Sequence, residues 1–167
     1  MVRTQTEVKG VLPLASGFRL TARADRIDVA EDGSVVIYDY KTGTLPLATH
    51  VTNLYAPQLP LEAAIAEAGG FAELGARPVR DLVYIQASGR QEGGEERQAS
   101  TAGVEALSVK AREDLERLVA YFEDPDTPYE VKRRLGAGFT GVYRHDDYEH
   151  LARVKEWLTQ EAEEEWR

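Results

Sequence analysis

Two strand-like stretches joined by a tight turn constrain the fold of this chain more than any other feature. Residues 18–29 (FRLTARADRIDV) alternate between small or apolar and charged side chains, and residues 35–41 (VVIYDYK) are rich in β-branched and aromatic residues. Both patterns are typical of strands. Between them, Asp32 and Gly33 tolerate the positive φ of a tight loop. The two stretches therefore predict an antiparallel hairpin.

A third alternating run precedes this hairpin. Residues 6–14 (TEVKGVLPL) place Val8, Leu12 and Leu14 on one face of an extended chain. Within residues 18–29, strict alternation places Ala24 on the face opposite to Asp25. Together, the three runs predict a three-stranded antiparallel meander.

The rest of the chain alternates helical and extended patterns. Helices are predicted over 57–68, 104–122 and 147–164, a strand over 79–86, and a polar, glycine-rich loop over 88–103. Pro57 and Pro60 fit only a first helical turn, where the amide donors have no intrahelical partner. This order predicts an α/β fold in a single domain over 1–167, with a mixed central sheet, flanking helices and a C-terminal helix.

The residues that are missing exclude several classes of site. The chain has no Cys, so a disulfide framework, a thiolate zinc site, an iron–sulfur cluster and a cysteine nucleophile are excluded. His50, His145 and His150 lack the spacing of a zinc site. No apolar run approaches the roughly 18 residues of a membrane span. We expect a cytoplasmic protein without membrane contact.

The charge of the chain is unevenly distributed. The net charge is −9, but residues 1–45 carry six basic and six acidic side chains, whereas residues 91–130 carry four basic and eleven acidic ones. A solvated helix face and loop account for the acidic stretch. The acidic total therefore does not exclude a phosphate-binding surface on the first half.

The chemistry in this sequence is concentrated in Asp25, Asp39 and Lys41. On a strand, Asp39 and Lys41 point to the same side, and a regular hairpin brings Asp25 close to them. Two carboxylates beside one ammonium suit a hard divalent cation that keeps several waters and bridges to a substrate phosphate. The alternative is a surface ion pair at the end of an edge strand.

Four segments, in order, resemble a known family. The phrases ADRIDV, DYKTGTLP, APQLPLEAAI and DYEHLARVKEW are similar to the RecB-type branch of the PD-(D/E)xK nucleases, with the signature G-x-x-D…(D/E)-x-K-(T/S)-G…Q-L. Within that branch the chain is most similar to the C-terminal nuclease domains of the Cys-free, alphaproteobacterial type of AddB subunits. The resemblance implies a restriction-endonuclease-like fold and Mg²⁺- or Mn²⁺-dependent cleavage of DNA in double-strand break repair and recombination. It also implies an AddA-type helicase–nuclease subunit as partner.

The resemblance also implies roles for individual residues. Asp25 and Asp39 match the metal-binding acids, Lys41 the catalytic lysine, and Gln58 the glutamine that opens the helix after the active-site strand. Glu7 matches either an acid on the first strand or a solvent-facing strand glutamate.

Further residues are expected nearby or at the DNA. Asp28 is expected to point away from Asp25 as a structural ion-pair partner. DNA contacts are expected from Arg23 and Arg26 and from a basic cluster at Lys132 and Arg133, for which a solvated turn is the alternative.

Two departures from the family pattern weigh against a complete nuclease. Many relatives carry a G-x-x-x-H helix before the first strand, and only six residues precede Glu7 here. Glu62 stands where a tyrosine often follows the family glutamine. We therefore expect a fragment or natural remnant of a larger protein, in which one face of the sheet or of the helix over 57–68 lies bare. Such a chain either self-associates or is less stable than one that includes the upstream segment. The alternative function is a catalytically weak nuclease-fold module that binds DNA or a helicase subunit.

Overall fold

The computed structural model describes residues 3–87, 94–100 and 103–128. The chain divides into two compact units, Met1–Thr127 and Pro128–Arg167, and the account below concerns the first. The helix predicted over 147–164 and the basic cluster at Lys132 and Arg133 lie outside the described residues. The single domain over 1–167 stays a prediction.

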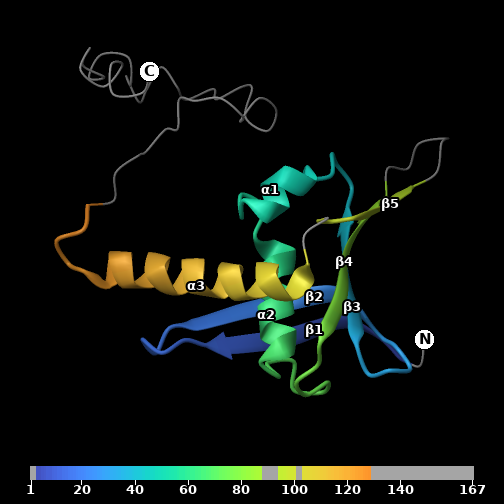
Figure 1. Ribbon diagram of the computed structural model, residues 1–167, viewed down its shortest axis with the longest axis horizontal. Helices are drawn as coiled ribbons and strands as arrows, with labels where there is room; N and C mark the ends of the chain where they lie inside the picture. The colour runs from blue at the N-terminus through green and yellow to red at the C-terminus, as the bar shows by residue number, and fades with distance from the viewer. Residues whose placement is uncertain (1–2, 88–93, 101–102, 129–167) are drawn as a thin grey trace, which may run out of the picture. The chain divides into compact units, whose positions relative to one another are not determined.

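A mixed five-stranded sheet forms the framework of the first unit (Figure 1). The strands lie in sequence order: β1 (Arg3–Pro13), β2 (Arg19–Val29), β3 (Val35–Lys41), β4 (Val79–Gln86) and β5 (Glu95–Gln98). Neighbouring strands are antiparallel except β3 and β4, which are parallel. The predicted meander and the strand over 79–86 are thereby confirmed, as is the mixed α/β class.

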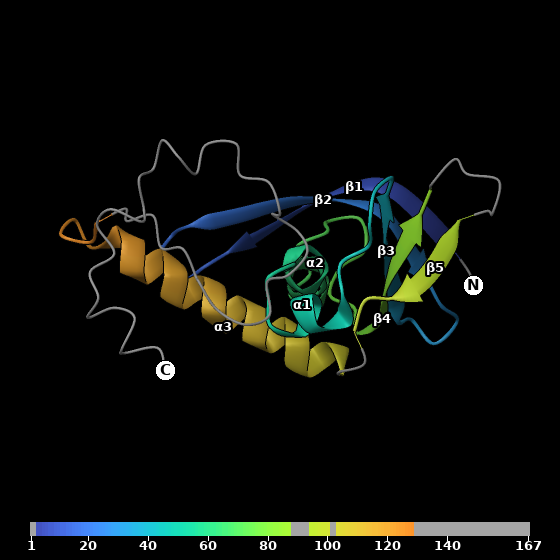
Figure 2. The ribbon, with the colours of Figure 1, turned by 90° about the horizontal axis from the view of Figure 1, so that it is seen from above.

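Three helices lie on one side of this sheet: α1 (Ala48–Thr52), α2 (Gln58–Glu67) and α3 (Val104–Glu123). Figure 2 shows the long β1–β2 hairpin curving over α2, with α3 on the far side of α2. The predicted helices over 57–68 and 104–122 are confirmed as α2 and α3. No helix in the described part of the chain is long and apolar enough to cross a membrane.

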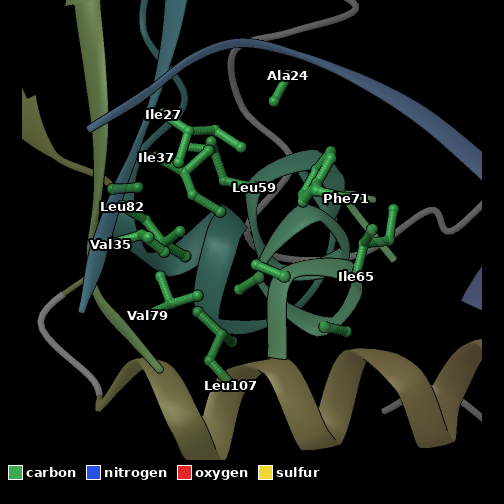
Figure 3. Close-up of a cluster of buried hydrophobic side chains, with 14 of the residues drawn as sticks. Ala24, Ile27, Val35, Ile37, Leu59, Ile65, Phe71, Val79, Leu82 and Leu107 are labelled. Atoms are coloured by element: carbon green, nitrogen blue, oxygen red, sulfur yellow. The ribbon is translucent and has the colours of Figure 1, made fainter. Parts of the chain in front are cut away.

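The hydrophobic core fills the space between the curved sheet and α2 (Figure 3). Ile27 and Ile37 from the sheet lie beside Leu59 of the helix, and Ile65 lies on another side of α2, near Phe71 (Figure 3). All five side chains are fully buried. Seven of the ten α2 residues are buried, so the helix is covered from several sides. Gly10 on β1 has no room for a side chain, because an added Cβ would lie 2.5 Å from the Phe71 ring.

The outer half of α3 is less well covered. Leu107 and Ala111 belong to the buried part of its apolar stripe, whereas Leu118, Tyr121 and Phe122 are exposed. Exposed apolar side chains therefore gather on α3, whereas the sequence predicted a bare face on the sheet or on the helix over 57–68. Self-association stays a prediction.

The loop predicted over 88–103 is wrong in part. Residues Glu95–Gln98 form β5 and pair with β4 from Val83 to Gln86. The short helix α1 was not predicted. β5 (EERQ) has no apolar residue, and its extended form depends on pairing with the free edge of β4.

Strict alternation fails at one level of the β1–β2 hairpin. Ala24 and Ile27 are both fully buried, and on the partner strand Gln5 and Val8 are both buried. Inward-facing residues are thus three apart on both strands at this level. Glu7 lies there with φ 56°, between the pairs Thr6↔Arg26 and Val8↔Ala24. The residue opposite Glu7 in this register is Asp25. Asp25 is two residues from Ile27 and therefore lies on the same face of the sheet.

Candidate active site

Three predicted site residues meet where β3 ends and α2 begins. Lys41 Nζ donates to Asp39 Oδ1 and to Gln58 Oε1, each at 3.0 Å. Gln58 Nε2 donates to the same Asp39 oxygen at 2.6 Å. Each pair among Asp39, Lys41 and Gln58 is thus joined by a hydrogen bond. Ligands of α/β sheets commonly bind at such carboxyl ends of parallel strands.

Asp39 is the most deeply buried member of this group. Its side chain is 2% exposed, whereas that of Lys41 is 34% exposed. Burial raises the pKa of the Asp39 carboxyl, and the nearby charge of Asp25 acts in the same direction. The hydrogen bond and charge of Lys41 oppose that rise. The surroundings of Asp39 therefore disfavour its ionised form, as is common for acids at functional sites.

Asp25 lies beside this group at the end of the β2–β3 ladder. The ladder ends at the pair Arg26↔Tyr38, and one step further in the same register Asp25 stands opposite Asp39. The Tyr40 backbone N–H donates to Asp25 Oδ2 at 2.9 Å. The hairpin register thus brings Asp25 next to Asp39, the arrangement that a regular hairpin predicts.

Glu62 joins the group although the sequence did not predict it as a site residue. It follows Gln58 by one turn of α2, and Gln58 Nε2 donates to Glu62 Oε1 at 3.2 Å. Burial raises the pKa of the Glu62 carboxyl to about 7. A single acid within the apolar run LPLEAAIA, four residues after a site glutamine, is the signal that could have identified it.

Glu7 and Arg23 form an exposed ion pair with each other. The Glu7 side chain is 57% exposed and that of Arg23 is 61% exposed. Both lie on the β1–β2 hairpin, and within the part of the chain that the structure describes neither forms a hydrogen bond or ion pair with Asp39, Lys41 or Gln58. Their roles as metal ligand and DNA contact stay predictions.

Arg26 belongs to a separate cluster on the opposite side of the sheet. Its guanidinium donates to both carboxylate oxygens of Asp28 and lies 4.5 Å from the Tyr38 ring centroid. It also reaches the Tyr40 hydroxyl at 3.5 Å. Asp28 is therefore the ion-pair partner that the sequence predicts, and Arg26 is not brought to Asp39.

A divalent cation fits the carboxylates at the end of β3. Asp39 Oδ2 is buried without a well-directed hydrogen bond, although Lys41 Nζ lies 2.7 Å away. Across residues 3–87, 94–100 and 103–128, no group of three or more His, Asp or Glu side chains could hold a metal ion. Mg²⁺ needs only one or two carboxylates, because waters and substrate phosphates complete its shell. Asp25 and Asp39 satisfy that requirement.

The sequence profile of the PD-(D/E)XK nuclease superfamily matches residues 2–165. The chain belongs to this superfamily. The restriction-endonuclease-like fold predicted for this nuclease-superfamily chain is thereby shown, with its mixed five-stranded sheet and flanking helices.

Individual relatives of this PD-(D/E)XK chain are similar over shorter stretches. An uncharacterised protein of Rickettsia typhi is 35% identical over 68 residues, which is 39% of this chain and 8% of that protein. One from Rickettsia conorii is 33% identical over 70 residues, covering 40% and 8%. The match thus spans less than a tenth of these curated relatives.

Among solved structures, the crystal structure of SSO0001 is similar with a TM-score of 0.40 and 19% identity. The similarity covers 69% of this chain and 50% of that one.

Proposed function

We propose that this chain is a nuclease that hydrolyses phosphodiester bonds of DNA with Mg²⁺ or Mn²⁺. The observation that carries the proposal is the hydrogen-bonded group of Asp39, Lys41 and Gln58 at the end of β3. Membership of a nuclease superfamily supports the reaction class. The adjacent Asp25 supplies a second carboxylate.

Asp25 and Asp39 would hold the cation. A bound divalent cation supplies a Lewis acid and makes a neighbouring water more acidic. Burial of Asp39 keeps this carboxylate in one position, and the backbone N–H of Tyr40 orients Asp25. The two acids are therefore fixed before substrate arrives.

Lys41 has the electrostatic role. In the hydrolysis, a water oxygen bonds to phosphorus and the bond to the leaving ester oxygen breaks. The attacking water gives a proton to solvent, and the leaving oxygen takes up a proton to become a hydroxyl. Negative charge grows on the phosphoryl oxygens and the leaving oxygen during this step. Two hydrogen bonds, to Asp39 and Gln58, hold the Lys41 ammonium in place, so it can offset that charge without reorganising.

We further propose that this activity serves double-strand break repair, coupled to an AddA-type helicase partner. The support is the sequence similarity of four separated segments to AddB nuclease domains. Co-purification of the two subunits, expressed together, tests this part separately from cleavage. Absence of a complex would contradict the partner and leave the nuclease proposal intact.

The nuclease proposal is tested with nicked-plasmid and end-labelled single-strand assays. Cleavage is expected with Mg²⁺ or Mn²⁺ and is expected to stop with EDTA or in Asp39→Ala. Asp81→Ala is the matched control, because Asp81 lies on the neighbouring strand β4, where it accepts from Gln98. Calorimetry should show weaker Mn²⁺ binding for Asp39→Ala. Equal cleavage by Asp39→Ala and wild type would contradict the proposal.

A second candidate function is an assembly module with the nuclease fold. The exposed apolar side chains of Val109 and Leu118 on α3 favour it, since exposed apolar surface marks interaction sites. This module would bind DNA or a protein partner, or pair with itself, without metal-dependent cleavage. Light scattering measures the self-association, and the cleavage assay separates the two candidates.

A further inference from the structure

Glu62 is a buried acid that the proposed chemistry does not use. Its side chain lies on α2 among apolar neighbours, and the residue is 2% exposed. Oε1 accepts one hydrogen bond from Gln58, and Oε2 is buried without a hydrogen-bond partner in the described part of the chain. Burying a carboxyl with so few partners costs stability, so packing alone does not account for it.

The Gln58 amide explains what this acid can do. One Nε2 proton goes to Asp39 Oδ1 and the other to Glu62 Oε1, while Oε1 of Gln58 accepts from Lys41. The two donors and the acceptor are thus all directed at ionisable groups. With only two of these bonds, the amide could rotate about the Asp39–Lys41 line. The bond to Glu62 is the third point that fixes its plane.

We propose that Glu62 is a positioning residue, which anchors the Gln58 amide and through it holds the Lys41 ammonium against Asp39. The inference rests on the proposed nuclease function for its catalytic consequence. It does not depend on that function for its structural content, which concerns the order of the Gln58 side chain.

Either protonation state of Glu62 can do this. The carboxyl accepts through Oε1 as an ion or as a neutral acid. Burial raises its pKa to about 7, and the charges of Asp39 and Asp25 add to the rise. A glutamine at this position keeps the accepting oxygen and carries no charge. A methionine keeps most of the volume and accepts no comparable hydrogen bond.

The cleavage test compares Glu62→Met, Glu62→Gln and a matched control, Glu67→Met. Glu67 lies on the same helix, and its carboxylate accepts from Ser108 of α3, away from Lys41. We expect Glu62→Met to lower kcat by about 10- to 100-fold, since small misplacements of a reacting group have effects of that order. KM and the half-saturating Mn²⁺ concentration should stay within about threefold, because DNA and metal contacts are unchanged.

A purely structural role predicts a different result. Glu62→Met removes a buried ionisable group, so its melting temperature should equal or exceed that of wild type while kcat falls. Glu62→Gln should restore kcat to within about threefold of wild type. Glu67→Met should keep kcat and have a lower melting temperature, because the hydrogen bond from Ser108 on α3 to Glu67 on α2 is lost and Ser108 keeps only the Glu105 carbonyl as acceptor. Equal losses of kcat in Glu62→Met and Glu67→Met would overturn the inference.

A second readout requires no cleavage. In protein labelled with ¹⁵N-glutamine, the Gln58 side-chain amide is assigned by its loss in Gln58→Ala. In wild type and in Glu62→Gln, the chemical shifts of its two protons should differ widely, and both protons should exchange slowly with water. In Glu62→Met, one of the two protons should exchange faster and move toward the chemical shift of a solvent-exposed amide. If wild type cuts no DNA, the nuclease proposal fails, and these signals alone decide the role of Glu62. Unchanged Gln58 signals in Glu62→Met would overturn the inference.

Discussion

Two ion pairs with the same local geometry lie on opposite sides of the sheet. Asp39 and Lys41 are two residues apart on β3, and Arg26 and Asp28 are two residues apart on β2. In both pairs the acid is almost fully buried, at 2% and 4% exposed, and the base is partly exposed, at 34% for Lys41 and 27% for Arg26. Sequence spacing and burial therefore do not distinguish them.

The pKa values of the two acids are shifted in opposite directions. Burial raises the pKa of Asp39, and the Lys41 contact does not overcome it. Burial is also the largest single influence on the pKa of Asp28 and raises it, but the hydrogen bonds from Arg26 and Thr4 and the charge of Arg26 together outweigh burial and leave the Asp28 pKa below its usual value. A guanidinium binds both oxygens of a carboxylate, and an ammonium acts as a point charge. Asp28, with both oxygens hydrogen-bonded to Arg26, stabilises the fold. Asp39, which has one oxygen without a hydrogen bond and lies near other acids, can bind a positively charged ligand.

The largest expected effect is at Lys41. Lys41→Ala should lower the rate of Mg²⁺-dependent DNA cleavage by about 10²–10³-fold, the usual loss for one preorganised charged group. Lys41→Arg should not restore it, because a guanidinium has a different reach and shape. Initial rates in Mg²⁺ and thermal melts of the three proteins measure this. Equal rates in all three proteins would show that Lys41 has a structural role, as Arg26 has, and not a catalytic one.

The second effect is a pH dependence of stability at the site. The pKa of Glu62 rises from 4.5 to about 7 on folding, so the folded state binds this proton more tightly. Its contribution is complete below pH 4.5 and is lost as the pH rises through 7. The loss corresponds to about 3 kcal/mol. Urea unfolding of wild type and Glu62→Gln between pH 4.5 and 8 measures it.

The difference between these two proteins isolates Glu62, because Asp39 is present in both. Wild type should lose stability relative to Glu62→Gln as the pH rises. A constant difference across that range would contradict the raised pKa.

The third effect compares the two acids directly. Asp28→Asn should lower the free energy of unfolding by about 1.5–3 kcal/mol, because two hydrogen bonds between charged groups are weakened. Asp39→Asn should cost less than about 1 kcal/mol, since it also removes a buried charge near Asp25 and Glu62. Chemical denaturation of both variants at pH 7 provides the measurement. A larger loss at Asp39 would reverse the comparison.

The smallest effect is at Tyr38. Tyr38→Leu should destabilise the protein by about 0.5–1 kcal/mol through loss of the ring under Arg26. Tyr38→Phe keeps the aromatic face, so its loss of stability should be less than half of the loss in Tyr38→Leu. Thermal melts of the two variants distinguish the ring contact from packing, and equal losses would assign the effect to the hydroxyl.

Much of the fold was predictable because alternation, β-branched runs and the Asp-Gly turn are local patterns. The site residues Asp39 and Lys41 share a face for the same reason. β5 and the face change at Asp25 were missed, because both depend on a neighbouring strand. Glu62 was noted only as a departure from a pattern. Its burial follows from the way sheet and helices surround α2, which no local pattern contains.

The matched face change in β1 and β2 also limits how this hairpin can change length. Deleting Glu7 alone would move the β1 side chains that precede it to the opposite face of the sheet. Gln5 and Val8 could then not both face the core opposite Ile27 and Ala24. Insertions or deletions at this level are tolerable only as compensated pairs, one in each strand. Homologous chains should therefore gain or lose residues here two at a time.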